Sequence, residues 1–463
     1  MWYGTERWKG GAADGAAYKL AYATSADGIR WIKPKLGLFQ VGGNSENNFV
    51  TPEMEAFNCT IIKDNSDVRA RRYKMIFSTG GRDPDWARFH SPLSVAYSHD
   101  GLRWERPRHV NPVLRGVSDD IWSFFFDPDR RKYLLLTRRV PNAPRDVSQY
   151  ESFDLVNWED KGRVLVAGDA RDPIDVGTEI YYLSPFRYED LYLGALNCLY
   201  THPVSETYGS FHRSPGYPGD RMGLMDIQLA YSRDGRTWTR PTDRSPIVPI
   251  GKPGELDQGM VYSALNPIVR AGDTWIYYTG NRWSHNWWEW LDAYDAQRGI
   301  RDIASVMLAR MPEDHFVSLD AGDAEGWFQS KPWGPPSEIF VNADAQGGSI
   351  QVELVTPYGE VIPDFGRSEC LPITSSGRNQ KIQWRSGRQP WDLRSNHRGG
   401  ISARFYLRHA RLYSYTMTLP DPDGKLARDK ANARWLEAIK HRSDNWSGKS
   451  NDPAPGLPPR PAP

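Results

Sequence analysis

Acidic side chains stand just ahead of apolar, strand-like segments at several places along this chain of 463 residues. One carboxylic acid that protonates a leaving oxygen and one carboxylate that attacks carbon or activates water can together break an acetal bond. Such a pair must come from segments that folding brings together. The carboxylates that qualify by position are Glu53, Glu55, Asp119, Asp120, Asp175, Glu179 and Asp257.

Asp120 and Glu179 hold the same place relative to the aromatic residue that opens the following segment. The differences 133 − 120 and 192 − 179 are both 13, counted to Tyr133 and Tyr192. We therefore predict Asp120 or Glu179 as the general acid and Glu55 as a supporting or base carboxylate. The competing interpretation is that each carboxylate caps a turn or pairs with an arginine.

Other polar and aromatic residues near these segments have side chains suited to holding a sugar. His285 and Trp287 belong to the aromatic stretch 282–288, whose rings either stack on a ligand or pack as a rim insertion. Neither the histidines nor the three cysteines show metal-ligand spacing, so we predict no metal and no other cofactor. The predicted substrate contacts are Asp119, Trp122, Arg138, Asp257, Tyr262, His285 and Trp287.

A repeated motif, Ser-x-Asp-Gly-x-x-Trp, indicates how these residues are positioned. Clear copies begin at Ser25, Ser98 and Ser232, a degenerate copy begins at Ser152, and the segment 310–316 closes the series. The intervals between the Asp positions are 73, 54, 80 and 80 (100 − 27, 154 − 100, 234 − 154 and 314 − 234). Each interval suits one four-stranded blade joined by tight Asp-Gly turns. The repeat thus predicts an all-β, five-bladed β-propeller that gathers the leading strands around one axis.

The blade pattern stops near residue 330. Alternating apolar and polar residues from 339 to about 417 predict half-buried strands of a separate, small β-sandwich. We expect the propeller over 1–330, the sandwich over 331–420, and a short helical segment with a Pro-rich tail over 421–463.

The composition favours a neutral, polar partner. A formal charge of +1 gives no field that favours nucleic acid or an anionic membrane, and no run of eighteen apolar residues occurs. The first residues already read as a strand, so we expect that an upstream piece precedes Met1. The compartment is unknown, with a secreted or periplasmic location as one expectation.

Several segments together carry a family resemblance. The repeated turns, the strand 275–280, the segment 316–319 and the stretch 342–349 resemble bacterial proteins related to glycoside hydrolase families 32 and 43. That resemblance implies a five-bladed propeller that carries the active site, and family 32 members add a C-terminal sandwich. The family 32 signatures are not cleanly present, although Arg82, Asp83 and Pro84 match one of them as a tripeptide.

The resemblance also implies a division of labour among the blades, with an Asp from the first blade as base or nucleophile. We expect the inner strand of the first blade to fall before Met1, so that Asp has no counterpart in this sequence unless the C-terminal part supplies a substitute. Three hypotheses remain open. The chain is a glycoside hydrolase acting on a poly- or oligosaccharide, a non-catalytic carbohydrate-binding propeller, or a six-bladed sialidase-like enzyme, which ranks last because only five turns are counted.

Overall fold

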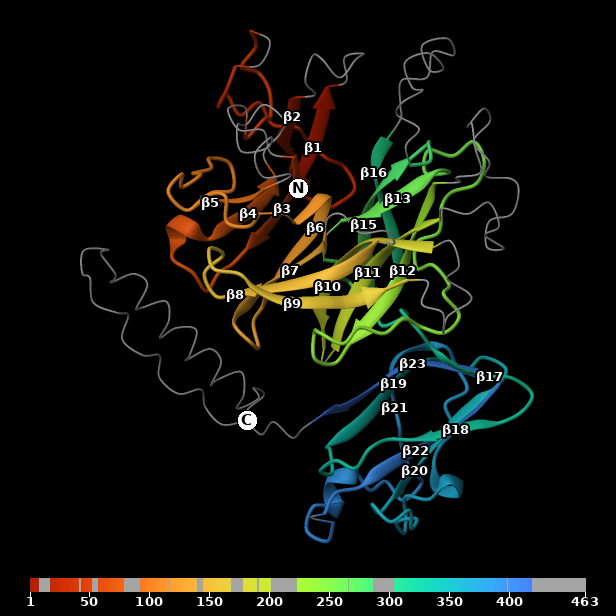
Figure 1. Cartoon of the computed structure of the whole chain (residues 1–463). Helices are drawn as coiled ribbons and strands as arrows, with labels where there is room; N and C mark the ends of the chain where they lie inside the picture. Colours follow the sequence, from red (N-terminus) through yellow and green to blue (C-terminus); the bar gives the residue numbers. More distant parts are fainter. Residues whose placement is uncertain are drawn as a thin grey trace, which may run out of the picture. The chain divides into compact units, whose positions relative to one another are not determined.

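In the described part of the computed structural model, the regular structure consists of β-strands and three short 3₁₀ turns (Figure 1). The structure describes residues 1–7, 17–40, 43–51, 57–78, 92–115, 117–139, 145–167, 178–189, 191–200, 223–264, 266–285, 304–397 and 399–418, with the backbone alone for 6–7, 17–19, 57, 117–121 and 139. Within these ranges there is no α-helix, which agrees with the predicted all-β class. The predicted helical segment and tail, 421–463, lie outside the described residues.

The described chain divides into two compact units. The first contains Met1–Arg270 and Trp275–Arg310, and the second contains Ala271–Thr274 and residues 311–418. Two strands of the second unit, β17 (Leu319–Ala321) and β18 (Gly326–Gln329), lie ahead of residue 331, where the sequence analysis begins the sandwich, and each pairs with a later strand of the same unit.

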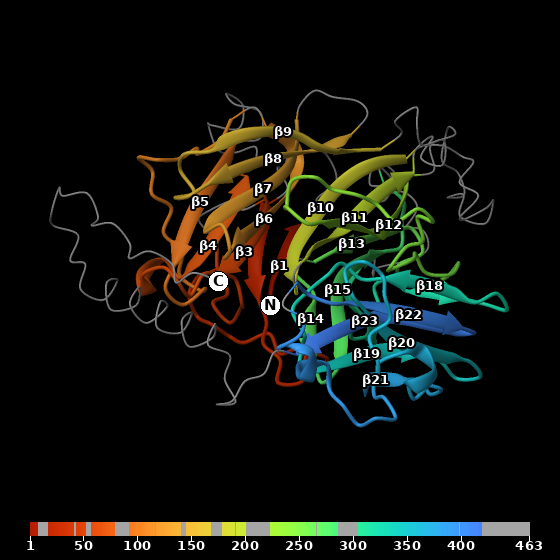
Figure 2. The ribbon, with the colours of Figure 1, turned by 90° about the horizontal axis from the view of Figure 1, so that it is seen from below.

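The first unit is built from antiparallel sheets that follow one another along the chain (Figures 1 and 2). The first two sheets contain β1 (Trp2–Arg7) and β2 (Ala17–Tyr22), then β3 (Phe57–Lys63), β4 (Tyr73–Ser78) and β5 (Leu93–Ser98). The third contains β6 (Val117–Asp127), β7 (Lys132–Arg139), β8 (Asp146–Ser152) and β9 (Glu159–Val166). Apolar residues of neighbouring sheets pack together in hydrophobic clusters. One such cluster contains Ile76 of the second sheet with Phe124 and Leu135 of the third.

The next sheet consists of two groups of strands. A single parallel residue pair, Met225 with Met260, joins the two groups. The first group contains β10 (Thr178–Tyr188), β11 (Leu191–Tyr200) and β12 (Leu224–Ser232). The second contains β13 (Met260–Ser263), β14 (Ile268–Arg270), β15 (Asp273–Asn281) and β16 (Ala304–Pro312).

The Ser-x-Asp turns share one hydrogen-bonding scheme. In each of the first four copies the Asp carboxylate accepts the backbone N–H groups two and three residues on, and the Ser hydroxyl accepts the N–H three residues on. In the first copy the N–H groups of Arg30 and Ile29 lower the pKa of Asp27 to about 2. The last segment differs, because Asp314 itself has a positive φ and its carboxylate accepts from Asn342 and Ser414.

The sheets of the first unit contact one another in chain order. Trp2 Nε1 donates to the Gly101 carbonyl oxygen at 2.7 Å, and Tyr133 Oη donates to Asp64 Oδ2 at 2.6 Å. Tyr192 Oη donates to Asp127 Oδ2 at 2.8 Å. The last strands then meet the first turn, where Tyr277 Oη donates to the Gly28 carbonyl oxygen at 2.6 Å. A closed cycle of contacts is what a ring of sheets requires, while the number of blades stays a prediction.

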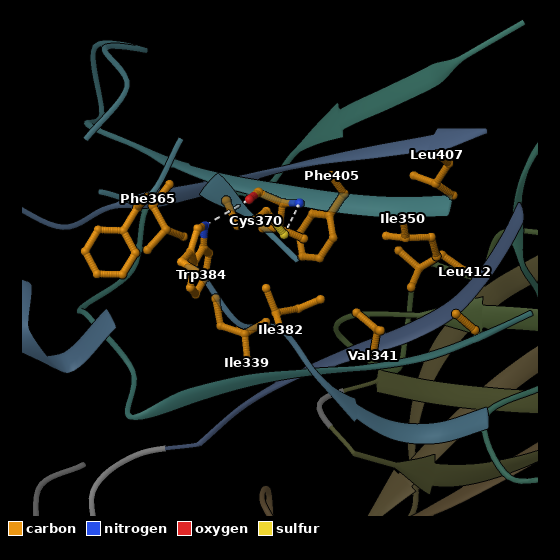
Figure 3. Close-up of a cluster of buried hydrophobic side chains, with 14 of the residues drawn as sticks. Ile339, Val341, Ile350, Phe365, Cys370, Ile382, Trp384, Phe405, Leu407 and Leu412 are labelled. Carbon is orange, nitrogen blue, oxygen red and sulfur yellow. Dashed lines mark hydrogen bonds between the residues drawn. The ribbon is translucent and has the colours of Figure 1, made fainter. Parts of the chain in front are cut away.

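The second unit has two antiparallel sheets that share one buried hydrophobic cluster, whose residues include Ile339, Val352, Phe405 and Trp384 (Figure 3). One sheet contains β17 (Leu319–Ala321), β23 (Ala410–Thr418), β19 (Glu338–Asp344) and β21 (Gly377–Lys381). The other contains β18 (Gly326–Gln329), β22 (Ser402–Arg408) and β20 (Ser349–Val355). The 3₁₀ turns are η2 (Arg69–Arg71), η6 (Arg367–Glu369) and η7 (Pro390–Leu393).

Candidate functional site

Tyr181 lies in a β-bulge of β10. Ile180 pairs with Cys198 and Tyr182 pairs with Asn197, so Tyr181 is the extra residue between two paired positions. A bulge bends its strand and changes the direction of the side chain there, and bulges are frequent beside active sites.

Four side chains from other segments surround Tyr181. Its hydroxyl and His285 Nε2 form a 2.9 Å hydrogen bond, with the two rings edge to face at a centroid distance of 5.1 Å. The guanidinium carbons of Arg138 and Arg145 lie 4.9 Å and 5.8 Å from the Tyr181 ring centroid. The Tyr262 ring follows at 6.1 Å. Residues from β7, β10 and β13 and from the segments just before β8 and just after β15 thus meet. We call Arg138, Arg145, Glu179, Tyr181, Tyr262 and His285 the Tyr181 cluster.

Glu179 supplies the carboxylate of this cluster. It forms an ion pair with Arg145, and the exposed fractions of the two side chains are 18% and 29%. A guanidinium partner stabilises an ionised carboxylate. Glu179 thus brings a carboxylate to this cluster, and its role in any reaction stays a prediction.

Tyr182 contacts the Tyr181 ring at a centroid distance of 6.3 Å, and it connects the cluster to neighbouring strands. Tyr182 Oη donates to the Ser263 carbonyl oxygen at 2.7 Å, and Asn197 Nδ2 donates to Ser263 Oγ at 2.8 Å. Burial raises the pKa of Tyr182 and of Tyr262 well above the ordinary value, so both remain neutral phenols. These bonds tie β10 and β11 to β13.

The backbone holds His285 close to a glycine. The His285 N–H donates to the Gly223 carbonyl oxygen at 2.7 Å. Gly223 has a φ of +60°, and a Cβ there would lie 2.8 Å from the His285 carbonyl oxygen. Only glycine can adopt this positive φ without strain and also leave room for the His285 backbone.

The structure brings together four of the residues that the sequence singled out, namely Arg138, Glu179, Tyr262 and His285. It places Trp122 in the hydrophobic cluster with Phe124, with a 4% exposed side chain that leaves little ring surface for a ligand. Asp257 is also buried, and it accepts a hydrogen bond from Tyr278 Oη at 2.9 Å.

The remaining predicted residues are described in part or not at all. Glu53, Glu55, Asp175 and Trp287 lie outside the described residues. Asp119 and Asp120 are in β6, between the paired positions Val117 and Trp122, where the ladder with β7 is irregular. Asp120 and Glu179 have equivalent positions in the sequence pattern, but their strand pairing differs. Glu179 has a partner in the neighbouring strand, Leu199, whereas Asp120 lies in the irregular part of its ladder.

The sequence analysis did not single out Tyr181 or Arg145 as functional residues. Tyr181 lies two positions after Glu179, a carboxylate at the start of its strand, and this position is the one sequence signal for a functional role of Tyr181. Arg145 has no such signal, because it precedes β8 and meets Glu179 only through the packing of β8 and β10.

A separate hollow of about 250 Å³ lies between the second and third sheets. Lys74 is 2% exposed there and bonds Asp64 at 3.1 Å and Asp67 at 2.9 Å. Tyr133 donates to the same Asp64 carboxylate. The polar groups of this hollow satisfy one another, and none of the residues of the Tyr181 cluster lines it.

Two classes of site are absent from the described ranges. No group of three or more His, Cys, Asp or Glu side chains there is arranged to hold a metal ion. No helix in the same ranges is long and apolar enough to cross a membrane.

Comparison with known proteins gives structural likenesses only. No family model and no curated protein sequence matches the chain. An N-acetylgalactosamine deacetylase from F. plautii is similar at 13% identity and a TM-score of 0.42, over 65% of this chain and 86% of the other. A sucrose-6-phosphate hydrolase from Lactobacillus gasseri is similar at 12% identity and a TM-score of 0.41, over 88% and 87%.

A family 32 β-fructofuranosidase from Bombyx mori is similar at 13% identity and a TM-score of 0.38, over 88% of this chain and 86% of the other. Likenesses at this level establish neither the family nor the activity of the chain. The function is therefore argued from the Tyr181 cluster.

Proposed function

We propose that this chain is a glycoside hydrolase that cleaves a poly- or oligosaccharide at the Tyr181 cluster. The observation that carries the proposal is the convergence of two guanidinium groups, a histidine and a second tyrosine ring on Tyr181, with one of these guanidinium groups, that of Arg145, paired with the Glu179 carboxylate. Aromatic rings suit the apolar faces of sugars, and the polar groups suit their hydroxyls. The proposed architecture is the five-bladed propeller of the sequence analysis, supported by the closed cycle of contacts.

The proposed mechanism divides the work between two carboxyl groups. Glu179, ionised beside Arg145, attacks the anomeric carbon or removes a proton from the attacking water. Asp120, from the neighbouring strand β6, protonates the glycosidic oxygen as the bond to the leaving sugar breaks. Glu55 supports the reacting sugar, and the Tyr181–His285 pair orients a hydroxyl.

Release of reducing sugar from a panel of plant and algal glycans tests this proposal. We expect Glu179→Gln and Asp120→Asn each to lower kcat/KM by about 10²–10⁴-fold. The matched control is Glu159→Gln, a carboxylate in the same unit that is 65% exposed and paired with Lys161. Full activity in both site variants would contradict the assignment.

One observation favours a second function, non-catalytic binding of carbohydrate. Within the described part of the Tyr181 cluster, Glu179 is the single carboxylate, and Arg145 already engages it. If the chain only binds carbohydrate, a glycan in an affinity gel should slow its migration while no reducing sugar is released. The Tyr181→Ala variant should then migrate without this retardation. Turnover by the wild-type chain would exclude this alternative.

A further inference from the structure

The outward face of the sheet β18–β22–β20 carries aromatic and planar polar side chains in two adjacent rows. In one row Trp327, Tyr406 and Gln351 are direct cross-strand neighbours. In the next row Gln329 pairs with Arg404, which pairs with Glu353. The alternate residues Phe328, Phe405 and Val352 point the other way, into the hydrophobic cluster. We call this surface the Trp327 face.

Two aromatic side chains, one on this face and one in the turn that follows β20, are open to solvent. Trp327 is 62% exposed and is the only exposed tryptophan among the described residues. Tyr358 is 93% exposed and lies in the turn that closes with the bond from Gly359 N–H to Thr356 O. Arg404 links the two, since its guanidinium carbon is 5.8 Å from the Trp327 ring centroid and its Nη2 donates to the Gly359 carbonyl oxygen at 3.2 Å.

The polar groups around the rings are held rigidly by one another. Arg404 Nε donates to Gln329 Oε1 at 2.9 Å, and Nη1 donates to Glu353 Oε1 at 2.8 Å. Tyr406 Oη donates to the same Glu353 oxygen at 2.7 Å. Arg367 stacks on the Tyr406 ring at 4.3 Å and reaches Gln351 Oε1 from Nε at 3.2 Å. Such mutual support keeps the side chains in one arrangement before a ligand arrives, which lowers the entropic cost of binding.

The charges of this face cancel locally. Arg404 pairs with Glu353, and Arg367 forms a two-point ion pair with Glu325. A face without net charge gives no Coulomb attraction to an anionic or cationic partner. Flat exposed rings beside fixed hydrogen-bonding groups instead match a neutral ligand with apolar faces and hydroxyl edges, which is the surface of a sugar ring.

We propose that the Trp327 face is a second carbohydrate site, which binds a chain of a neutral polysaccharide through Trp327 and Tyr358. The site is separate from the Tyr181 cluster and does not depend on catalysis there. Trp327 and Tyr358 stack on sugar rings, and the row of Gln329, Arg404 and Glu353 meets their hydroxyls.

Affinity gel electrophoresis of the full chain tests this site, in native gels that contain a mixed-linkage β-glucan, arabinoxylan, galactomannan, levan or, as the anionic probe, polygalacturonate. We expect at least one neutral polysaccharide to retard the wild-type chain. Trp327→Ala and Tyr358→Ala should each raise the apparent Kd about tenfold or more, since an exposed anchoring ring carries much of such binding. Phe153→Ala is the matched control, because Phe153 is 71% exposed in the other unit.

Several results would overturn the proposal. They are no retardation by any neutral polysaccharide, retardation by polygalacturonate alone, or equal retardation of Trp327→Ala and wild type. A dimer in size-exclusion chromatography that Trp327→Ala dissociates would assign the face to a second copy of the chain. Circular dichroism and the thermal midpoint verify that the variant folds. Trp327-dependent binding without any sugar release would leave this site standing and remove the hydrolase proposal.

Discussion

Tyr181 shows how one residue can link several groups of a site. Its hydroxyl meets His285, its ring lies beside Arg138 and Arg145, and Arg145 in turn holds Glu179. Both guanidinium groups favour negative charge nearby, so the cluster suits an acceptor carboxylate and a hydroxyl-bearing ligand.

Tyr181→Phe separates the hydroxyl from the ring. The variant keeps the ring contacts with Arg138 and Tyr262 but loses the hydrogen bond to His285. We expect kcat/KM on the glycan that the wild-type chain cleaves to fall by about tenfold, and the free energy of unfolding to change by no more than ~1 kcal/mol. The comparison variant is Tyr182→Phe, which loses the bond to Ser263 O and should affect stability more than activity.

The composition of this cluster was only partly predictable. Glu179, Tyr262, Arg138 and His285 stand at segment ends, which sequence patterns reveal. Tyr181 owes its position to a bulge, and the bulge depends on the pairing of Ile180 and Tyr182 with Cys198 and Asn197. Pairing of that kind depends on contacts between strands and leaves no mark in the local sequence.

At the scale of elements, the Ser-x-Asp turns fasten each sheet to its neighbour. Gly101 has a φ of +77°, and a Cβ there would lie 2.6 Å from the Trp2 ring. The Trp2 indole N–H donates to the same glycine's carbonyl oxygen. The turns could be predicted from the sequence, because their hydrogen bonds form within the motif itself. The contacts between sheets could not, because they join residues that are far apart in the chain.

Gly101→Ala tests this fastening. The substitution combines backbone strain with a clash, so we expect a loss of roughly 2–4 kcal/mol in the free energy of unfolding. Gly37→Ala is the matched control, because Gly37 has a φ of +64° but open space around a Cβ, and it should lose about 1–2 kcal/mol. Urea unfolding of both variants measures the difference; equal losses would show that the Trp2 contact is unimportant.

Glu151 provides a second connection, between the third sheet and the turn after β12. Its carboxylate is 1% exposed and meets Arg236, Lys132 and Arg130. Burial opposes ionisation, but Arg236 and Lys132 outweigh it and lower the pKa of Glu151 to about 2, against an ordinary 4.5. A carboxyl whose pKa is depressed by folding stabilises the protein above its unfolded pKa.

The stabilisation by Glu151 should therefore be present at pH 6 and be lost as the pH falls from about 5 towards 2, by roughly 2 kcal/mol. Urea unfolding midpoints between pH 7 and pH 3 measure this loss. Glu151→Gln should be less stable at pH 7 and should show a shallower dependence on pH than the wild type. Glu159→Gln, at an exposed site, should retain the wild-type slope.

The whole molecule contains two units with hydrophobic clusters of their own. Leu354 is fully buried in the cluster of the second unit, and Leu135 is fully buried in a cluster of the first. The sequence predicted a division near residue 330 from the end of the repeat, because a change of pattern is visible without coordinates, and the assignment of the two parts as a propeller and a sandwich stays a prediction.

Separate clusters predict separate unfolding. We expect Leu354→Ala to lower the midpoint of one calorimetric transition, through a loss of about 2–5 kcal/mol, and to leave a second transition in place. Leu135→Ala should affect the other transition. A single transition that both substitutions shift equally would show that the two units unfold together.

The bond from Tyr277 to Gly28 joins residues that are 249 positions apart. A ribosome that adds about 5–20 residues per second needs roughly 12–50 s to make the chain between them. A two-stranded ribbon such as β1–β2 is marginally stable by itself. During synthesis β1 and β2 therefore wait through this interval without one of their contacts to a neighbouring sheet, the contact that Tyr277 later supplies at Gly28.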